Sequence, residues 1–96
     1  EGYKSPGMKY RHYAPKAKLI LVLPTAHNKI PTLLQHYQQL KKKVVVLKPT
    51  ASTLFATLRH ADQQHMNVIM VRGVPEHGLK LALMNRLRKA ASKIVS

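Results

Sequence analysis

The chain has 96 residues, 45% of them hydrophobic, which is enough for one small domain with its own core. It contains no cysteine, which excludes disulfides and thiolate metal sites, and no apolar run approaches the length needed to span a bilayer. It begins at Glu1 without a methionine, so we expect a processed product or an excised fragment whose targeting segment is already gone.

The charge balance is strongly basic. Seventeen lysines and arginines face three acidic residues, Glu1, Asp62 and Glu76, which gives a net charge of +14. Such a surface repels itself, and a polyanionic partner explains it more directly than a need for solubility does. Nucleic acid is the partner that this charge favours, with an anionic membrane surface or an acidic protein as the alternatives.

Residues 1–17, EGYKSPGMKYRHYAPKA, have no helical period and predict a basic arm ahead of a domain formed by residues 18–96. Tyrosines alternate there with cations, a pattern suited to stacking on unpaired bases while contacting phosphates. The same tyrosines could instead pack on the domain through an edge strand at residues 8–13, and composition does not separate the two readings. The arm residues predicted to contact RNA are Lys4, Lys9, Tyr10, Arg11 and Tyr13.

From residue 18 onward, apolar runs alternate with helical patterns. The runs LILVL (19–23), VVVL (44–47) and VIMV (68–71) predict strands that are covered on both faces. Helical spacing follows each run, in NKIPTLLQHYQQLKKK, TLFATLRHADQQH and LKLALMNRLRKAASKIV. Asn28 is predicted to cap the first helix, and Thr50 or Ser52 the second.

The order β-α-β-α-β-α predicts an α/β fold, with three α-β-α layers around a small, mainly parallel sheet. The crossover connections should be right-handed. Three strands make a small sheet, so the N-terminal arm is a candidate for an added edge strand.

Cations are predicted at both edges of this sheet. Lys16, Lys18 and Lys41–Lys43 precede strands, whereas Lys29, Lys48 and Arg72 follow them. An enzyme with one anionic substrate needs charge mainly at the strand exits, where open α/β sheets bind ligands. Charge at both edges predicts instead a protein surrounded by phosphates, with helix N-termini near Asn28 and Thr50 adding backbone donors. The predicted RNA-binding residues outside the arm are Lys29, Lys41, Lys42, Lys43, Lys48, Arg72, Arg86, Lys89 and Lys93.

The sequence contains few of the residue patterns that form catalytic sites. Only two carboxylates, Asp62 and Glu76, lie beyond the N-terminus, no serine stands in a nucleophile-elbow context, and no glycine-rich phosphate loop follows the first strand. His60 and His65 lie five apart, on different helix faces, and the other histidines have no nearby partner. We therefore expect no enzyme, no metal site and no cofactor.

The segment LRHADQQHMNVIMVRGVPEHG, Leu58 to Gly78, resembles the anticodon-binding domain of class II aminoacyl-tRNA synthetases. The matching residues are Ala61, Asp62, Val68, Ile69, Val71 and Gly73. The resemblance extends over about residues 18–78 and implies an α/β layout and contact with tRNA. The segment KAKLILVLP, Lys16 to Pro24, is more weakly similar to the kink-turn-binding ribosomal proteins, whose signature glycines are missing here. Both likenesses imply an RNA partner.

The sequence therefore predicts a non-catalytic RNA-binding component of an intracellular ribonucleoprotein particle, most simply a ribosomal and conceivably mitochondrial protein. Its expected partners are ribosomal or other structured RNA and neighbouring proteins, with no membrane and no small-molecule substrate. One alternative is a tRNA-binding module, and another is an adaptor that docks to a protein through a sheet edge or the last helix. A third, a small-molecule enzyme, requires a ligand at the strand exits and activity that depends on His27 or Lys48.

Overall fold

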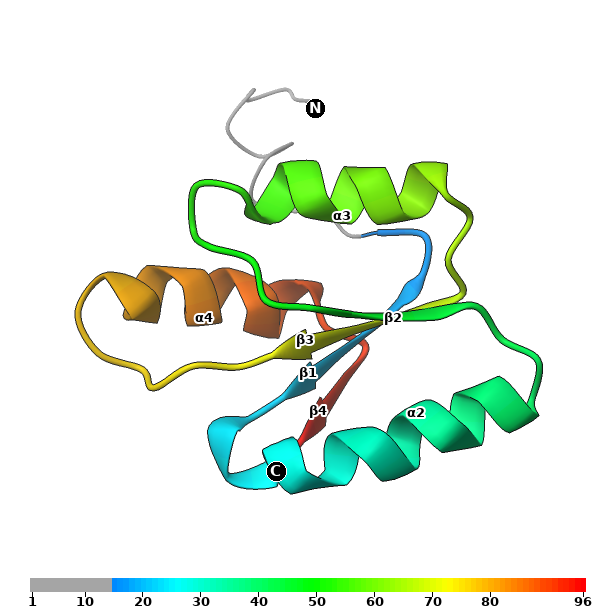
Figure 1. Cartoon of the computed structure of the whole chain (residues 1–96). Helices are drawn as coiled ribbons and strands as arrows, with labels where there is room; N and C mark the ends of the chain where they lie inside the picture. The colour runs from blue at the N-terminus through cyan, green and yellow to red at the C-terminus, as the bar shows by residue number, and fades with distance from the viewer. Residues whose placement is uncertain (1–14) are drawn as a thin grey trace.

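The computed structural model describes residues 15–96, apart from the side chain of Leu79. Residues 1–14 lie outside that range, so the division into an arm and a domain and the five predicted arm contacts stay predictions. Figure 1 shows the elements in chain order. They are β1 (Lys18–Val22), η1 (Pro24–Lys29), α2 (Ile30–Gln39), β2 (Val44–Leu47), α3 (Leu54–Gln63), β3 (Val68–Arg72), α4 (Leu79–Ala90) and β4 (Lys93–Val95).

The sheet is parallel throughout and has the strand order β2-β3-β1-β4. The chain moves from β1 past β3 to β2 and then reverses direction through β3 to β4. Crossovers of one hand place their helices on opposite faces when the direction reverses. Figure 1 shows this result, with α2 below the sheet and α3 and α4 above it. The predicted three-layer α/β fold is confirmed.

The two central strands, β1 and β3, carry the core. Leu19 and Leu21 face α3 and α4, whereas Ile20 and Val22 face α2, because successive residues of a strand point to opposite sides. Residues 19–22 and 69–71 are all 0% exposed. Continuous apolar runs therefore correctly identified these strands. β2 is different, because it lies at a sheet edge and its four residues are only half-buried.

A fourth strand replaces the end of the predicted last helix. α4 ends at Ala90, and Ala91 is already extended. The amide of Ser92 donates to the Leu19 carbonyl at 2.8 Å, and the amide of Leu23 donates to the Val95 carbonyl at 2.9 Å. This pairing satisfies backbone groups on the flank of β1 that β3 leaves open. The prediction of a helix to residue 95 is therefore wrong, because the C-terminal residues form a strand that pairs with β1. The edge strand predicted for the arm lies outside the described residues.

The helix starts also differ from prediction. η1 leads directly into α2, whose N-cap is Lys29, so Asn28 does not cap it. The N-cap of α3 is Thr53, and no side chain caps it through a hydrogen bond. The two caps predicted from residue type at Asn28 and at Thr50 or Ser52 are therefore wrong. Pro31 lies in the first turn of α2, a position that suits a residue with no amide hydrogen.

Both α2 and α3 end in a left-handed residue that is not glycine. Lys41 has a φ of 60° and His65 a φ of 59°. After each, the next amide bonds back five residues, from Lys42 to the Tyr37 carbonyl at 3.0 Å and from Met66 to the Ala61 carbonyl at 3.2 Å. These are Schellman caps, which glycine usually supplies. Among the described residues, no helix is both long and apolar enough to cross a membrane.

Candidate ligand-binding site at the carboxyl edge of the sheet

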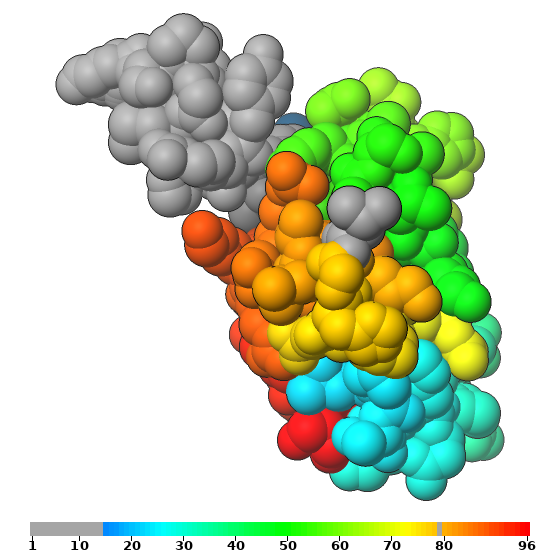
Figure 2. Space-filling view, turned by 90° about the vertical axis from the view of Figure 1, so that its left-hand side faces the viewer, coloured from blue at the N-terminus to red at the C-terminus, as the bar shows by residue number. Residues whose placement is uncertain are grey.

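A cleft of about 790 Å³ opens where strands β1, β2 and β3 end. Figure 2 looks onto this edge, where the segment after β3 (gold) lies between the segments after β2 (green) and β1 (cyan). We call this opening the carboxyl-edge cleft. Its lining residues are Pro24, His27, Lys48, Pro49, Thr50, Ala51, Ser52, Arg72, Gly73, Val74, Pro75, Lys80, Ala82 and Leu83.

Gly73 holds the loop after β3 tightly against the end of β1. Its amide donates to the Val22 carbonyl at 2.7 Å. A Cβ on this residue would lie 2.9 Å from the Val22 carbonyl oxygen and 3.3 Å from Cε of Met84. Both distances are shorter than ordinary contacts, so only glycine lets the chain pass here without displacing the backbone of β1.

Three cations line the cleft: Lys48 after β2, Arg72 at the end of β3 and Lys80 in the first turn of α4. No acidic residue of the described part of the chain lines it. Glu76 lies in the nearby loop, where its carboxylate accepts two hydrogen bonds from the guanidinium of Arg88, one of them at 3.2 Å. Those hydrogen bonds hold the pKa of Glu76 below its usual value and raise the pKa of Arg88. The nearest acid is thus already paired, and the cleft is electropositive.

Hydroxyl groups and one histidine complete the polar lining. Thr50 Oγ1 lies 2.9 Å from Thr53 Oγ1 and 3.2 Å from Ser52 Oγ, so these hydroxyls bond one another. His27 belongs to η1, and its Nε2 is buried with no hydrogen-bond partner among the described residues. Buried polar atoms almost always have a partner, so this nitrogen is an exception among the described residues.

The amino edge of the sheet, where the strands begin, uses its charges differently. The carboxylate of Asp62 accepts hydrogen bonds from the backbone amides of Lys16, at 3.0 and 3.1 Å, and of Ala17, at 3.3 Å. Lys43 Nζ donates to the Gln64 carbonyl at the end of α3, at 3.0 Å. The Lys43 amide bonds the Asn67 side chain at 2.8 Å. These hydrogen bonds connect the end of α3 and the residues after it with the residues just before β1 and β2.

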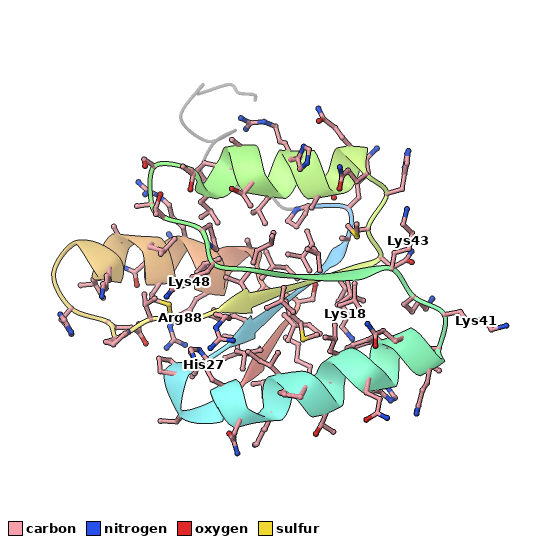
Figure 3. The ribbon with its side chains drawn as sticks, viewed as in Figure 1. Lys18, His27, Lys41, Lys43, Lys48 and Arg88 are labelled. Atoms are coloured by element: carbon pink, nitrogen blue, oxygen red, sulfur yellow. The ribbon has the colours of Figure 1, made fainter. Side chains whose placement is uncertain are left out.

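The structure separates the predicted RNA-binding residues into distinct places. Figure 3 shows His27 and Lys48 at the carboxyl edge and Lys18, Lys41 and Lys43 at the amino edge. Three of the predicted cations follow strands: Lys29, Lys48 and Arg72. Only Lys48 and Arg72 line the cleft, because Lys29 turns away and donates to the Ser96 carbonyl at 2.9 Å. The remaining predicted residues of α4 and β4 also lie outside the cleft lining: Arg86, Lys89 and Lys93.

Sequence reasoning missed Lys80 as a member of this site. Its position shortly after the third strand, at the start of the following helix, was the signal that places it at the strand exits. His27 was named from the sequence only as a residue on which activity would depend if the protein were a small-molecule enzyme. Within residues 15–96, no group of three or more His, Cys, Asp or Glu side chains is placed to hold a metal ion.

The fold and the cleft together define a class: a small, doubly wound α/β domain with an electropositive ligand-sized opening at the carboxyl ends of its strands. A family model described as the C-terminal domain of threonylcarbamoyl-AMP synthase matches residues 1–92. The chain belongs to this family.

Similar proteins agree with this assignment. A threonylcarbamoyl-AMP synthase of Pyrococcus abyssi is 41% identical over 108 residues, which cover 92% of this chain and 32% of the relative. The crystal structure of P. abyssi Sua5 complexed with L-threonine matches with a TM-score of 0.79 and 39% identity, over 97% of this chain and 34% of that one. A C-terminal Sua5 domain from Pyrococcus horikoshii matches with a TM-score of 0.69 and 32% identity, over 85% of this chain and 98% of that one.

Several predictions from the sequence are corrected by these matches. The resemblances to synthetase anticodon-binding domains and to kink-turn proteins are wrong, because strand–helix alternation with a glycine after the third strand is common to many parallel α/β domains. The ribosomal component and its mitochondrial setting are wrong as well, and so is the exclusion of an enzyme, since the relatives are named as a synthase. No finding tests the predicted intracellular location.

The prediction of no small-molecule substrate is also wrong for this family, because a similar protein was crystallised with L-threonine. The error came from the charge at the amino edge, which was read as contact with phosphates but which includes a structural lysine, Lys43. The chain spans about a third of the length of the relatives it matches. An RNA partner stays a prediction from charge.

Proposed function

We propose that this chain is the C-terminal domain of an enzyme that makes threonylcarbamoyl-AMP. The observation that carries the proposal is the family match over residues 1–92, supported by 41% identity to a synthase of that name. The name describes a product in which a carbamoylated threonine is joined to the phosphate of AMP. The carboxylate of threonine and the phosphate of the nucleotide are negative, so both present groups that cations of this domain can bind.

The domain contributes binding and positioning, and the reacting groups come from the rest of the enzyme. The carboxylates of Asp62 and Glu76 are occupied, by backbone amides and by Arg88 respectively, so neither is poised as a general base. The hydroxyls of Thr50, Ser52 and Thr53 bond one another. A nucleophile needs an adjacent base that no described residue supplies to these hydroxyls.

The test is to incubate the full-length protein with L-threonine, bicarbonate and ATP and to detect threonylcarbamoyl-AMP by mass spectrometry. We expect product from the full-length protein and a large loss when residues 18–96 are deleted. Adding the separate domain back distinguishes a contribution of the domain from simple misfolding of the truncated enzyme. A full-length protein that makes no product, under conditions in which the P. abyssi relative does, contradicts the proposal.

RNA is a second candidate partner, favoured by the exposed cations that lie outside the cleft. Those with no hydrogen bond from their side chains among the described residues include Lys41, Lys42, Arg86, Lys89 and Lys93. Binding of RNA through phosphates weakens with salt, by about 0.7 to 0.9 units of log–log slope for each phosphate contact. A filter-binding titration from low to physiological salt tests this. A flat salt response argues against RNA and for docking to a protein.

A further inference from the structure

We propose that the carboxyl-edge cleft binds a small organic phosphate of about the size of a nucleoside monophosphate. This goes beyond the proposed function, because it assigns a ligand site to this domain itself. The domain covers about a third of the length of its relatives.

The first argument is position. β1 and β3 are neighbours in the sheet, but the helix after β1 lies on one face and the helix after β3 on the other. The chain segments that leave these two strands therefore diverge, and a crevice opens between them. Open α/β sheets bind their ligands at such a point, outside the carboxyl ends of the strands. The cleft lies there, with Pro24 and His27 on one side and Gly73 and Val74 on the other.

The second argument is charge. Lys48, Arg72 and Lys80 come from three different elements and meet at one opening. Within residues 15–96, no ion pair joins any of them to a carboxylate, and the nearby Glu76 is held by Arg88. Three cations lining one site repel one another, which opposes folding. A bound anion offsets that repulsion, and a phosphate offers several oxygens that can accept hydrogen bonds from guanidinium and ammonium groups together.

The third argument is the buried Nε2 of His27. It lines the same cleft and lacks a partner among the described residues. An imidazole nitrogen left in this state costs stability, and a rotation of the side chain toward the cleft gives it a phosphate oxygen as a partner. The hydroxyls of Thr50 and Ser52 also line the cleft, and because their mutual bond uses only one of the two hydrogens, the other can turn toward an anion.

The fourth argument concerns what else the ligand contains. The rest of the lining is apolar, from Pro24, Pro49, Val74, Pro75 and Leu83, so it suits an organic body better than a free inorganic ion. A volume of about 790 Å³ accommodates a molecule of nucleotide size. Among the described residues, no amide or carboxylate side chain lines the cleft, and the three cations there favour a phosphate over a base edge. We therefore expect recognition to depend mainly on the phosphate and to be tolerant of the base.

The experiment is an NMR titration of the ¹⁵N-labelled domain. The P. horikoshii domain crystallised as a separate chain, of which the match covers 98%, so the domain can be studied alone. AMP, GMP, adenosine and inorganic phosphate are added separately at physiological salt, which suppresses weak surface binding. We expect AMP and GMP to bind within about threefold of each other, at about 10 µM to 1 mM, with shifts at residues 24–27, 48–52, 72–75 and 80–83. Adenosine should not bind, and phosphate should bind more weakly.

Matched variants separate the cleft from the overall charge. Arg72→Gln removes a cleft cation, and Arg59→Gln removes an exposed arginine of α3 outside the lining, so both lower the net charge equally. We expect the first to weaken AMP binding about tenfold or more and the second to leave it unchanged. The thermal midpoint and the spectrum of each free variant show that it is folded, and Lys48→Gln repeats the test if Arg72→Gln is not.

Three outcomes overturn the proposal. One is the absence of AMP binding up to millimolar concentration, and another is adenosine binding as tightly as AMP. The third is shifts spread over both sheet edges that Arg59→Gln weakens as much as Arg72→Gln does. None of these outcomes depends on whether the full-length protein makes threonylcarbamoyl-AMP, so this proposal and the proposed function fail separately.

Discussion

At the amino edge of the sheet, charged groups hold the backbone together, whereas at the carboxyl edge cations line an open cleft. Lys43 and Asp62 bond backbone groups of other elements, whereas Lys48 and Arg72 form no ion pair within the described part of the chain. Sequence composition does not distinguish these two uses of charge. Substitutions should distinguish them, because the charges at the amino edge contribute to folding stability and those at the carboxyl edge contribute to ligand binding.

The largest effect on stability should come from the backbone that closes the carboxyl edge. Gly73→Val places a side chain 2.9 Å from the Val22 carbonyl oxygen. We expect a loss of about 2–3 kcal/mol in the free energy of unfolding, because the chain must move to admit it. Urea unfolding measures this. Ala82→Val creates the same side chain at an exposed helical position and should cost about 0.6 kcal/mol. Equal effects of the two would contradict the tight packing inferred at Gly73.

The next effect should come from the amino edge. Asp62→Ala removes the acceptor of the Lys16 and Ala17 amides and should cost about 1–2 kcal/mol in the free energy of unfolding. Asp62→Asn keeps one acceptor oxygen and should cost less. Hydrogen exchange of the two amides, followed by NMR, reports the same loss locally. If exchange at these amides is unchanged in Asp62→Ala, the carboxylate does not anchor the start of β1.

A smaller effect distinguishes two neighbouring lysines. Lys43→Met removes the hydrogen bond to the Gln64 carbonyl and should cost about 0.5–1 kcal/mol, since this exposed contact is partly screened by solvent. Lys42→Met removes the same charge one residue earlier, where the lysine side chain bonds no described residue, and should have no such cost. Thermal unfolding of both variants checks this. Equal stability of the two would show that the charge, and not the bond, matters.

The smallest effect should depend on pH. Arg88 lowers the pKa of Glu76, so the pair stabilises the folded chain above the ordinary carboxyl pKa, and that stability is lost as pH falls through the lowered pKa. Glu76→Gln should therefore be slightly less stable than the wild type at pH 7, and the difference should shrink as pH falls through the lowered pKa of Glu76. Both groups are exposed, so the difference at pH 7 should be small. A difference that does not shrink with falling pH would mean that the carboxylate charge is not its cause.

The sequence was sufficient to predict the fold, but not its fourth strand or the ends of its helices. Unbroken apolar runs identified β1 and β3, because both faces of a central parallel strand are covered. The short β4 was hidden, since Lys93-Ile94-Val95 continues the helical stripe and only pairing with β1 makes it a strand. The ends of α2 and α3 were also hidden, because Lys41 and His65 occupy a conformation usually signalled by glycine.

The site was predicted in part. Lys48 and Arg72 follow strands, so their place at the carboxyl edge could be read from the chain order. The side chains that bond the backbone could not be recognised, because a lysine that bonds a carbonyl looks like any other lysine in a sequence. Lys29 and Lys43 are of this kind. Counting them as free cations made both edges seem alike and favoured a ribonucleoprotein over an enzyme domain.

The most direct test of the difference between the two edges measures AMP affinity and thermal stability in the same pair of variants, Lys48→Met and Lys43→Met. Both lose one positive charge and gain the same side chain. The account predicts that Lys48→Met loses affinity and keeps the wild-type melting temperature, while Lys43→Met keeps affinity and melts at a lower temperature. If the two variants lose affinity and stability in equal measure, the edges do not differ in function and the cleft is not a binding site.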